Sequence, residues 1–240
     1  MKALILAAGL GSRLKNKTES LPKALVKVSG KPILSYQIDA LLDNNISDIV
    51  IVLGKEKQKI IDYINLNYPK INVQFIDNPD YEKSNSSYSF WLAKDQIKDE
   101  SYIHLNCDII FSSALLGSII RDRNPNIIAV RTNMKLTDEM ENVVIKDGKI
   151  LKMRKKLGED STGKAFGLAK FNIKSTKMII KKIESYMLNG DLNQHCYGMI
   201  RELVSEIDYH PFLANDDLLL EVNTKDDLKW ANNLLLDVVS

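Results

Sequence analysis

The sequence predicts an α/β protein with a mixed, mostly parallel β-sheet flanked by helices. Short apolar runs recur at residues 2–8, 48–53 and 101–106, the pattern of strands that are covered on both faces. Segments with apolar residues at helical spacing lie between them, at residues 33–42 and 55–66. Because strands and helices alternate with short connections, we expect parallel pairing with right-handed crossovers.

Composition narrows the class further. A chain of 240 residues suits one large domain that buries its core without cross-links. The 33 Lys and Arg against 31 Asp and Glu give a net charge of +2, which provides no overall field for nucleic acid or an anionic membrane. No apolar run reaches the roughly 18 residues of a membrane-spanning helix. Cys107 and Cys196 lack metal-ligand spacing and the N-terminus lacks a cleavage site, so we expect a cytoplasmic protein without disulfides.

The opening strand ends in a glycine turn, which is the strongest functional signal in the chain. Gly9 and Gly11 follow the strand, then Arg13, and ten residues later Lys23. Glycines beside a strand end let backbone N–H groups approach a phosphate closely. Arg13 and Lys23 would supply the positive charge that a polyphosphate requires. The alternative is a surface turn with two solvated basic residues.

Two familiar phosphate loops do not fit this turn. A dinucleotide fingerprint needs a third glycine where Leu14 stands, and a P-loop needs a Gly-Lys-Ser/Thr ending that is absent. The stretch instead resembles the signature of the sugar-phosphate nucleotidyltransferase superfamily, spelled here by LAAGLGSR at residues 6–13 and by Pro22 and Lys23. The resemblance implies a Rossmann-like fold with Arg13 and Lys23 as catalytic residues. The nucleotide-binding residues that it implies in this stretch are Leu6, Ala7, Ala8, Gly9, Gly11 and Ser12.

After a third strand at residues 71–76, a polar loop runs into a helix at about residues 86–94. Ser86 or Ser87 would fit the N-cap of this helix, so one interpretation is an ordinary capped helix. The other is a polar rim that reads a nucleotide base through small side chains and helix N–H groups. Relatives carry a similar Asn-x-x-Ser sequence here. The residues that the resemblance assigns to the nucleotide are Asn85, Ser86 and Ser89.

The fourth strand, at residues 101–106, delivers Asp108 to its carboxyl end. Ligands of open parallel sheets bind at this edge. Mg²⁺ prefers carboxylate and phosphate oxygens, so an aspartate facing a triphosphate loop is a candidate ligand. An aspartate that merely caps a helix is the alternative. Relatives place their metal aspartate at this point, often after Asn-x, as in Asn106-Cys107-Asp108 here.

The middle of the chain changes in character. Residues 137–153 indicate two strands joined by Asp147 and Gly148, the strongest short signal of a hairpin. The other elements predicted around this hairpin are a helix at 114–123, a strand at 127–131, a strand at 165–171 and helices at 175–188 and 192–204. We expect residues 1–131 and 218–240 to form a nucleotide-binding core and residues 132–217 to form the acceptor-binding portion of a single domain.

The basic triplet at residues 154–156 is either a solvated strand end or a clamp for the phosphate of a second substrate. The hairpin, the triplet and the following strand resemble a branch of the superfamily with cytidylyltransferases for phosphocholine and 2-aminoethylphosphonate. Relatives often have Gly-Glu where this chain has Gly163 and Lys164, and a cation there argues against choline or ethanolamine as the head group. The implied acceptor-binding residues are Lys155, Lys156 and Tyr197.

Aromatic residues offer a second route to a cationic acceptor. Tyr81, Tyr88, Trp91 and Tyr197 could build a wall for an ammonium group by cation–π contact. Packing in the core explains each of them more simply. His104 and His210 carry no catalytic signal and are interpreted as structural residues.

The sequence predicts a last strand at residues 218–223 and then a final helix with Thr224 as its N-cap. Relatives have Glu-Ile-Asp at this strand end, which completes the metal site opposite the first aspartate. Glu221 is retained here, but Asn223 replaces the second acid and contributes an oxygen without negative charge. The expected cofactor is Mg²⁺ on Asp108, Glu221 and Asn223, held more weakly than in relatives unless Glu221 compensates.

These inferences converge on transfer of CMP from CTP to a small phosphorylated or phosphonate acceptor, with release of pyrophosphate. The alternatives are a UTP- or dTTP-dependent sugar-1-phosphate enzyme and an inactive nucleotide-binding relative, which Asn223 favours. The expected partners are CTP and the acceptor, with no nucleic acid and no membrane. The resemblance also suggests a homodimer.

Overall fold

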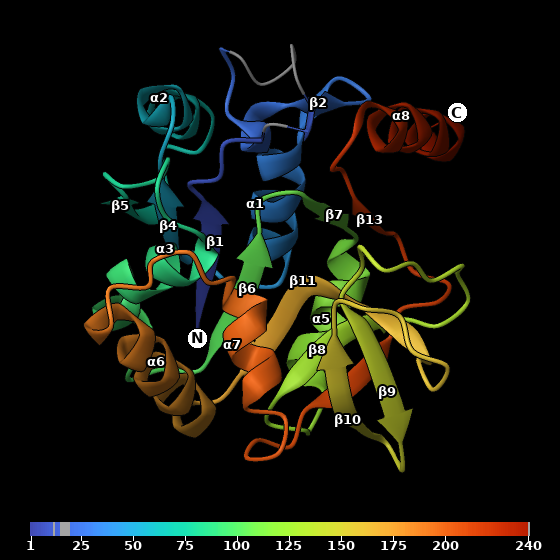
Figure 1. The fold of residues 1–240 in the computed structure, drawn as a ribbon. Helices are drawn as coiled ribbons and strands as arrows, with labels where there is room; N and C mark the ends of the chain where they lie inside the picture. The colour runs from blue at the N-terminus through green and yellow to red at the C-terminus, as the bar shows by residue number, and fades with distance from the viewer. Residues whose placement is uncertain (12, 15–19, 240) are drawn as a thin grey trace.

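A computed structural model describes residues 1–11, 13–14 and 20–239 of the chain. In this part of the chain a nine-stranded sheet has the order β10-β9-β11-β6-β1-β4-β5, and β8 pairs with both β11 and β12 (Figure 1). The strands of the sheet are β1 (Lys2–Ala7), β4 (Asp48–Leu53), β5 (Asn72–Asp77), β6 (Tyr102–Asn106), β8 (Ile127–Arg131), β9 (Asn142–Lys146), β10 (Lys149–Arg154), β11 (Gly163–Phe171) and β12 (His210–Leu213).

Half of this sheet is parallel. β1 pairs in parallel with both β4 and β6, and β4 pairs in parallel with β5. β11 then runs antiparallel to β6 and to β8, so the sheet is mixed, as the sequence predicted. The β9–β10 hairpin turns at Asp147 and Gly148, whose φ angles of 51° and 73° lie in the left-handed region. The Asp-Gly signal therefore identified this turn correctly.

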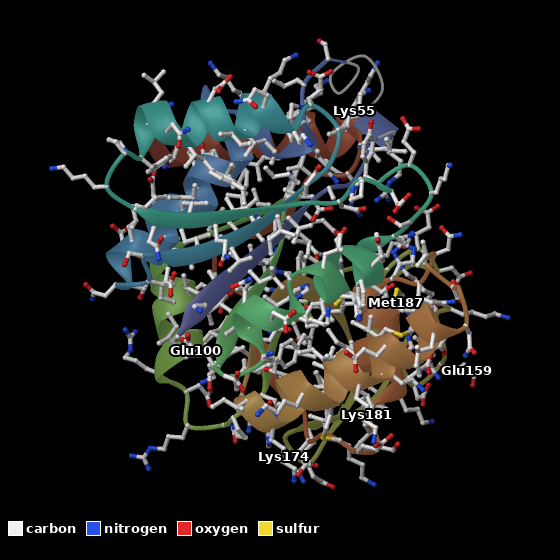
Figure 2. All side chains as sticks on the ribbon, turned by 90° about the vertical axis from the view of Figure 1, so that its left-hand side faces the viewer. Lys55, Glu100, Glu159, Lys174, Lys181 and Met187 are labelled. Carbon is white, nitrogen blue, oxygen red and sulfur yellow. The ribbon has the colours of Figure 1, made fainter. Side chains whose placement is uncertain are left out.

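Helices cover both faces of the sheet, and β1 shows why its sequence is continuously apolar. Ala3 and Ile5 belong to the core under α1, α2 and α5, whereas Leu4 and Leu6 belong to the core under α3, α6 and α7. Figure 2 shows α2 on one side of the strands and α3 and α6 on the other. The helices are α1 (Ile33–Asp43), α2 (Lys57–Asn67), α3 (Ser86–Leu92), α4 (Lys94–Ile97), α5 (Ser113–Arg121), α6 (Ile173–Leu188), α7 (Cys196–Glu202) and α8 (Lys225–Val239).

Two small sheets complete the fold beside the main one. Strands β2 (Lys27–Val28) and β3 (Lys31–Pro32) pair antiparallel after the 3₁₀ turn η2 (Lys23–Leu25). Strands β7 (Ile109–Phe111) and β13 (Leu219–Glu221) also pair antiparallel and lie side by side in Figure 1. The β7–β13 ladder brings the end of the chain next to the end of β6, where Asp108 stands.

The structure corrects two details of the sequence prediction. Asn85 caps α3, accepting a hydrogen bond from the Ser86 backbone N–H at 2.8 Å, so neither Ser86 nor Ser87 is the cap. The helix predicted at residues 192–204 is only Cys196–Glu202. Strands β2, β3, β7 and β12 were not predicted, because runs of two to four residues are too short to show periodicity.

Helix α8 begins at a capped N-terminus, as the sequence predicted. The Thr224 hydroxyl accepts from the Asp227 backbone N–H at 3.1 Å, and Asp227 accepts from the Thr224 N–H at 2.8 Å. This reciprocal capping box confirms Thr224 as the start of α8.

Within the residues described, no helix combines the length and the apolar character needed to cross a membrane.

Candidate functional site

Two adjoining cavities lie at the carboxyl ends of β1 and β6. The loop cavity, about 430 Å³, is lined by Leu6, Ala8, Gly9, Leu10, Gly11, Arg13, Lys23, Asn78, Tyr81, Glu82, Ser84, Asn85, Ser86, Ser89, Asn106, Cys107, Asp108, Lys155, His195, Glu221 and Asn223. The hairpin cavity, about 290 Å³, is lined by Arg13, Ser86, Asn106, Thr137, Glu139, Met140, Glu141, Lys155, Lys164, Ala165, Gly167, His195, Tyr197, Glu221, Asn223, Thr224 and Asp227. Residues common to both linings form the wall between them, so the cavities are neighbours.

The glycine turn forms one side of the loop cavity. Alternation along β1 and just beyond it places Leu6 and Ala8 on the cavity side, whereas Ala7 packs into the opposite core. Gly11 has a φ of 65°, a left-handed conformation that glycine adopts without strain. Gly54 permits close approach from β4, because a Cβ there would lie 2.5 Å from the Ala8 carbonyl oxygen. Ser12, predicted to contact the nucleotide, lies outside the described residues.

The two predicted catalytic residues, Arg13 and Lys23, donate hydrogen bonds to the same side-chain amide oxygen, that of Asn223. Lys23 lies in η2 with 9% of its surface exposed, and its Nζ donates to Asp108 Oδ2 at 2.9 Å. The same amine donates to Asn223 Oδ1 at 2.7 Å, and an Arg13 guanidinium nitrogen donates to this oxygen at 2.7 Å as well. The structure therefore brings Arg13, Lys23, Asp108 and Asn223 together.

The β7–β13 ladder places the backbone at Glu221 beside the backbone at Asp108, and both residues line the loop cavity. Glu221 is opposite Ile109, and the Val222 N–H donates to the Asp108 carbonyl at 2.8 Å. Glu221 accepts a hydrogen bond from Lys164 Nζ. Burial raises the pKa of Glu221, but the Lys164 charge and hydrogen bonds from Lys164 and Asn223 outweigh it, so the net pKa lies below the ordinary value. Glu221 is therefore ionised at neutral pH.

This pair fits a divalent cation that also binds substrate phosphates. The Asp108 Oδ1 atom is buried and has no hydrogen-bond partner among the described residues. No group of three or more His, Cys, Asp or Glu side chains suited to a metal occurs in that part of the chain. Mg²⁺ commonly binds through one or two carboxylates and completes its coordination with phosphates and water. The Asn223 oxygen already accepts from Lys23 and Arg13, so it can join a metal only by releasing them.

The three polar residues predicted to contact a base all line the loop cavity. The Ser86 hydroxyl accepts from the Cys196 N–H at 2.9 Å, and the Ser89 hydroxyl accepts from the Asn78 side chain at 3.0 Å. These bonds fix both oxygens while each O–H remains a donor. Asn78 is 1% exposed and was missed by the sequence reasoning, since a lone Asn after a strand resembles an ordinary turn residue.

Of the predicted acceptor-binding residues, two line the hairpin cavity. Lys155 borders both cavities, and Tyr197 borders the hairpin cavity with its hydroxyl donating to the Phe166 carbonyl at 2.6 Å. Lys156 is exposed and is not part of either lining. Tyr88 and Trp91 stack on each other, with ring centroids 6.0 Å apart, away from both cavities.

Two residues of the shared wall escaped the sequence analysis. His195 precedes α7, and partial burial together with the charges of Lys155, Arg201 and Arg13 lowers its pKa, so it is neutral at neutral pH. Asn106 ends β6, and its Oδ1 contacts the Nε2 of buried His104 at 3.2 Å. His104 is buried neutral, since burial lowers its pKa to about 4. In the sequence, Asn106 stood out only as part of the Asn106-Cys107-Asp108 motif, which predicted a role for Asp108.

Gly167 makes room for the Asn106 side chain. A Cβ at position 167 would lie 2.4 Å from the Asn106 side-chain amide. We expect Gly167→Ala to lower the free energy of unfolding by about 1–3 kcal/mol, because overpacking displaces buried groups. Urea denaturation followed by circular dichroism measures this change. Gly198→Ala is the matched control, since the nearest atom would be 4.0 Å from its Cβ, and it should leave stability equal or higher. Equal midpoints for both variants would contradict the packing argument.

Comparisons with known proteins agree with this arrangement. A family model described as the MobA-like NTP transferase domain matches residues 3–222. The chain is 27% identical over 238 residues to the choline-phosphate cytidylyltransferase of Streptococcus pneumoniae, with 98% of each chain covered. It is 26% identical over 254 residues to the CTP:phosphoglutamine cytidylyltransferase of Campylobacter jejuni, with 95% of this chain and 98% of the relative covered.

Solved structures share the same fold. A CTP:phosphocholine cytidylyltransferase from Streptococcus pneumoniae superposes with a TM-score of 0.78 at 24% identity over 98% of both chains. The inositol-1-phosphate CTP transferase from T. maritima superposes with a TM-score of 0.82 at 19% identity, covering 99% of this chain and 95% of that one. The superfamily resemblance of the glycine turn and the expected fold are thereby confirmed. The chain belongs to the family of the MobA-like NTP transferase domain.

Proposed function

We propose that this protein transfers CMP from CTP to a small phosphorylated or phosphonate acceptor and releases pyrophosphate. The observation that supports it most directly is the Lys23 amine, held 2.9 Å from Asp108 and 2.7 Å from Asn223 beside the glycine turn. Relatives that match the chain over almost their whole length are a choline-phosphate and a phosphoglutamine cytidylyltransferase. The nucleotide would occupy the loop cavity and the acceptor the hairpin cavity.

In this mechanism the protein positions two phosphates and neutralises charge. The acceptor phosphate oxygen is already ionised at neutral pH, so it attacks the α-phosphorus in line without a general base. The turn at Gly9 and Gly11 would hold the β- and γ-phosphates through its backbone. Arg13 would stabilise the departing pyrophosphate, and Lys23 would offset the charge that builds on the α-phosphate.

A divalent cation completes this charge balance. Asp108 and Glu221 would hold Mg²⁺, which supplies Lewis-acid polarisation of phosphate oxygens when bound. Lys23 and Arg13 would turn from the Asn223 oxygen toward the phosphates. Asn223 thus orients both cations in the ligand-free protein, which gives the asparagine a role that does not require loss of activity.

Base recognition would fall to the polar rim of the loop cavity. The Ser86 and Ser89 hydroxyl oxygens accept hydrogen bonds from Cys196 and Asn78, so each O–H is left as a donor for a ligand. Asn85 borders the same cavity and offers its side-chain amide. Small, positioned donors of this kind suit the carbonyl and ring nitrogen of a pyrimidine.

Pyrophosphate release tests the proposal. The protein is incubated with Mg²⁺ and each of CTP, UTP, dTTP, ATP and GTP, against phosphorylated alcohols, amino acids and sugars. We expect CTP to give the highest kcat/KM with at least one acceptor. Preference for UTP or dTTP with a sugar 1-phosphate would replace this function by that of a sugar nucleotidyltransferase. Stabilisation by CTP in thermal melting without turnover of any acceptor would indicate a nucleotide-binding module.

A further inference from the structure

We propose that the acceptor carries hydroxyl or carboxylate oxygens beyond its phosphate and no cationic group. The inference rests on the proposed function and narrows it to one chemical class, phosphorylated polyols and hydroxy acids. We base this inference on the charges that are fixed in the wall of the hairpin cavity. We also base it on the scarcity of open aromatic faces in the part of the wall that the structure describes.

The first observation is a cation built into the wall. Lys164, on β11, lines the hairpin cavity, and its side chain is only 10% exposed. Its Nζ is held by the Glu221 carboxylate and lies 4.3 Å from the centroid of the Phe166 ring. Because the amine is held from two sides, it stays in place when a ligand arrives. A ligand ammonium group would meet this fixed positive charge.

The second observation is that the carboxylates of this cavity are already paired. Glu141 receives two hydrogen bonds from the Arg201 guanidinium, at 2.9 and 3.0 Å. Asp227 accepts two backbone N–H groups at the start of α8, at 2.9 and 2.8 Å. Glu221 is paired with Lys164. These contacts offset the negative charge of Glu141 and Glu221 and occupy one oxygen of Asp227, which leaves less charge for a cationic head group.

The lining charges outside these contacts are of both signs. Among the described residues, Arg13 and Lys155 line the cavity without an ion pair to any carboxylate, and Glu139 and Asp227 are the lining carboxylates without an ion pair. Glu139 is exposed and stands in the loop before β9, so water screens its charge. The acceptor phosphate would take up the charge of Lys155, because Arg13 is assigned to the departing pyrophosphate. No described lining carboxylate is both buried and without a partner, so none offers an uncompensated charge to an ammonium group.

The third observation concerns aromatic rings. A quaternary ammonium group is bound by the open faces of several aromatic side chains. In the described lining, Tyr197 is the one Phe, Tyr or Trp residue, and its hydroxyl is committed to the Phe166 carbonyl. Lys164 lies over the ring of Phe166, whose carbonyl holds the Tyr197 hydroxyl. The protein's own cation thus covers one face of this ring.

The test compares acceptors of matched size with CTP and Mg²⁺. Phosphocholine and phosphoethanolamine form the cationic set, and glycerol 3-phosphate, 3-phosphoglycerate and inositol 1-phosphate form the oxygen-rich set. We expect the best oxygen-rich acceptor to exceed phosphocholine by at least about 30-fold in kcat/KM, the size of a discrimination set by unfavourable polar contacts. If phosphocholine is the best acceptor, the inference fails while the proposed function stands.

Substitution of Lys164 tests whether this residue causes the preference for oxygen-rich over cationic acceptors. Lys164→Gln should reduce the ratio of oxygen-rich to cationic kcat/KM by about tenfold, whereas Lys164→Arg should preserve it. Because the result is a ratio, any effect on Glu221 and the metal applies to both acceptors and cancels. Lys146→Gln, on the exposed end of β9, is the control and should leave the ratio unchanged. An unchanged ratio in folded Lys164→Gln overturns the assignment.

Binding decides the outcome if turnover is absent. Without turnover of any acceptor by any nucleotide the proposed function fails, and the same ligands are then titrated by calorimetry. Tighter binding of glycerol 3-phosphate than of phosphocholine would support the charge argument on its own. Equal or weaker binding would refute it.

Discussion

Lys23→Ala is expected to lower kcat for pyrophosphate release by about 10³-fold, or about 4 kcal/mol of transition-state stabilisation. The Lys23 amine is the one described cation that touches both Asp108 and Asn223, so its loss removes a positive charge from the centre of the site. The measurement is steady-state release of pyrophosphate from CTP with the best acceptor. Lys23→Arg should rescue little, because the planar guanidinium is wider than the buried amine it replaces.

Controls separate this catalytic loss from a loss of fold. Lys27→Ala changes an exposed lysine of β2 and should leave kcat within twofold. Thermal unfolding of Lys23→Ala should remain cooperative, because most of the core lies in the two clusters on either side of the main sheet. A folded Lys23→Ala protein that retains kcat within tenfold of wild type would refute the assigned role.

Asp108→Asn is expected to abolish the dependence of stability on Mg²⁺ as well as turnover. The substitution keeps the shape of the side chain but removes the charge next to the buried, unpaired Oδ1 atom. When CTP, with Mg²⁺ present, is at about 100 times its dissociation constant, it should stabilise the wild type by about 2.7 kcal/mol relative to the apo protein. This corresponds to a rise of about 5–10 °C in Tm. In Asp108→Asn, the additional rise in Tm that Mg²⁺ gives over CTP alone should vanish.

The melting experiment with CTP alone is the internal control. CTP without Mg²⁺ should still raise Tm in both proteins, since the glycine turn and Arg13 are unchanged. Asp122→Asn, beyond the end of α5, should behave like the wild type in every condition. If Asp108→Asn gains as much from Mg²⁺ as the wild type does, Asp108 is not a metal ligand.

Much of the fold could be predicted because it depends on local sequence. The strands at residues 48–53 and 127–131 have the predicted bounds, since continuous apolar runs between polar ends define a buried strand without further context. The Asp147-Gly148 turn has its own conformational signature and was found directly. The approach of Glu221 to Asp108 was anticipated only from the family resemblance, because a pairing across more than one hundred residues leaves no local pattern.

The rest of the site could not be predicted for the same physical reason. His195 stands before a short helix in a polar loop, and nothing in its neighbours indicates that it borders both cavities. Lys164 was noticed as a departure from relatives, but its pairing with Glu221 depends on the distant β13 strand. Ser86 was interpreted as a cap or a base contact, whereas its hydroxyl first accepts from Cys196, 110 residues away. Such contacts are decided by tertiary packing.

The hydrogen bonds that the Asn223 side-chain oxygen accepts have a consequence for when the site forms during synthesis. It joins Arg13 and Lys23 across 210 and 200 residues of sequence, so the site depends on contacts between segments that are far apart along the chain. During synthesis Lys23 is added 200 residues before Asn223, so this contact forms only after the intervening segments have been made. The geometry of the site is therefore assembled late in the folding of a growing chain.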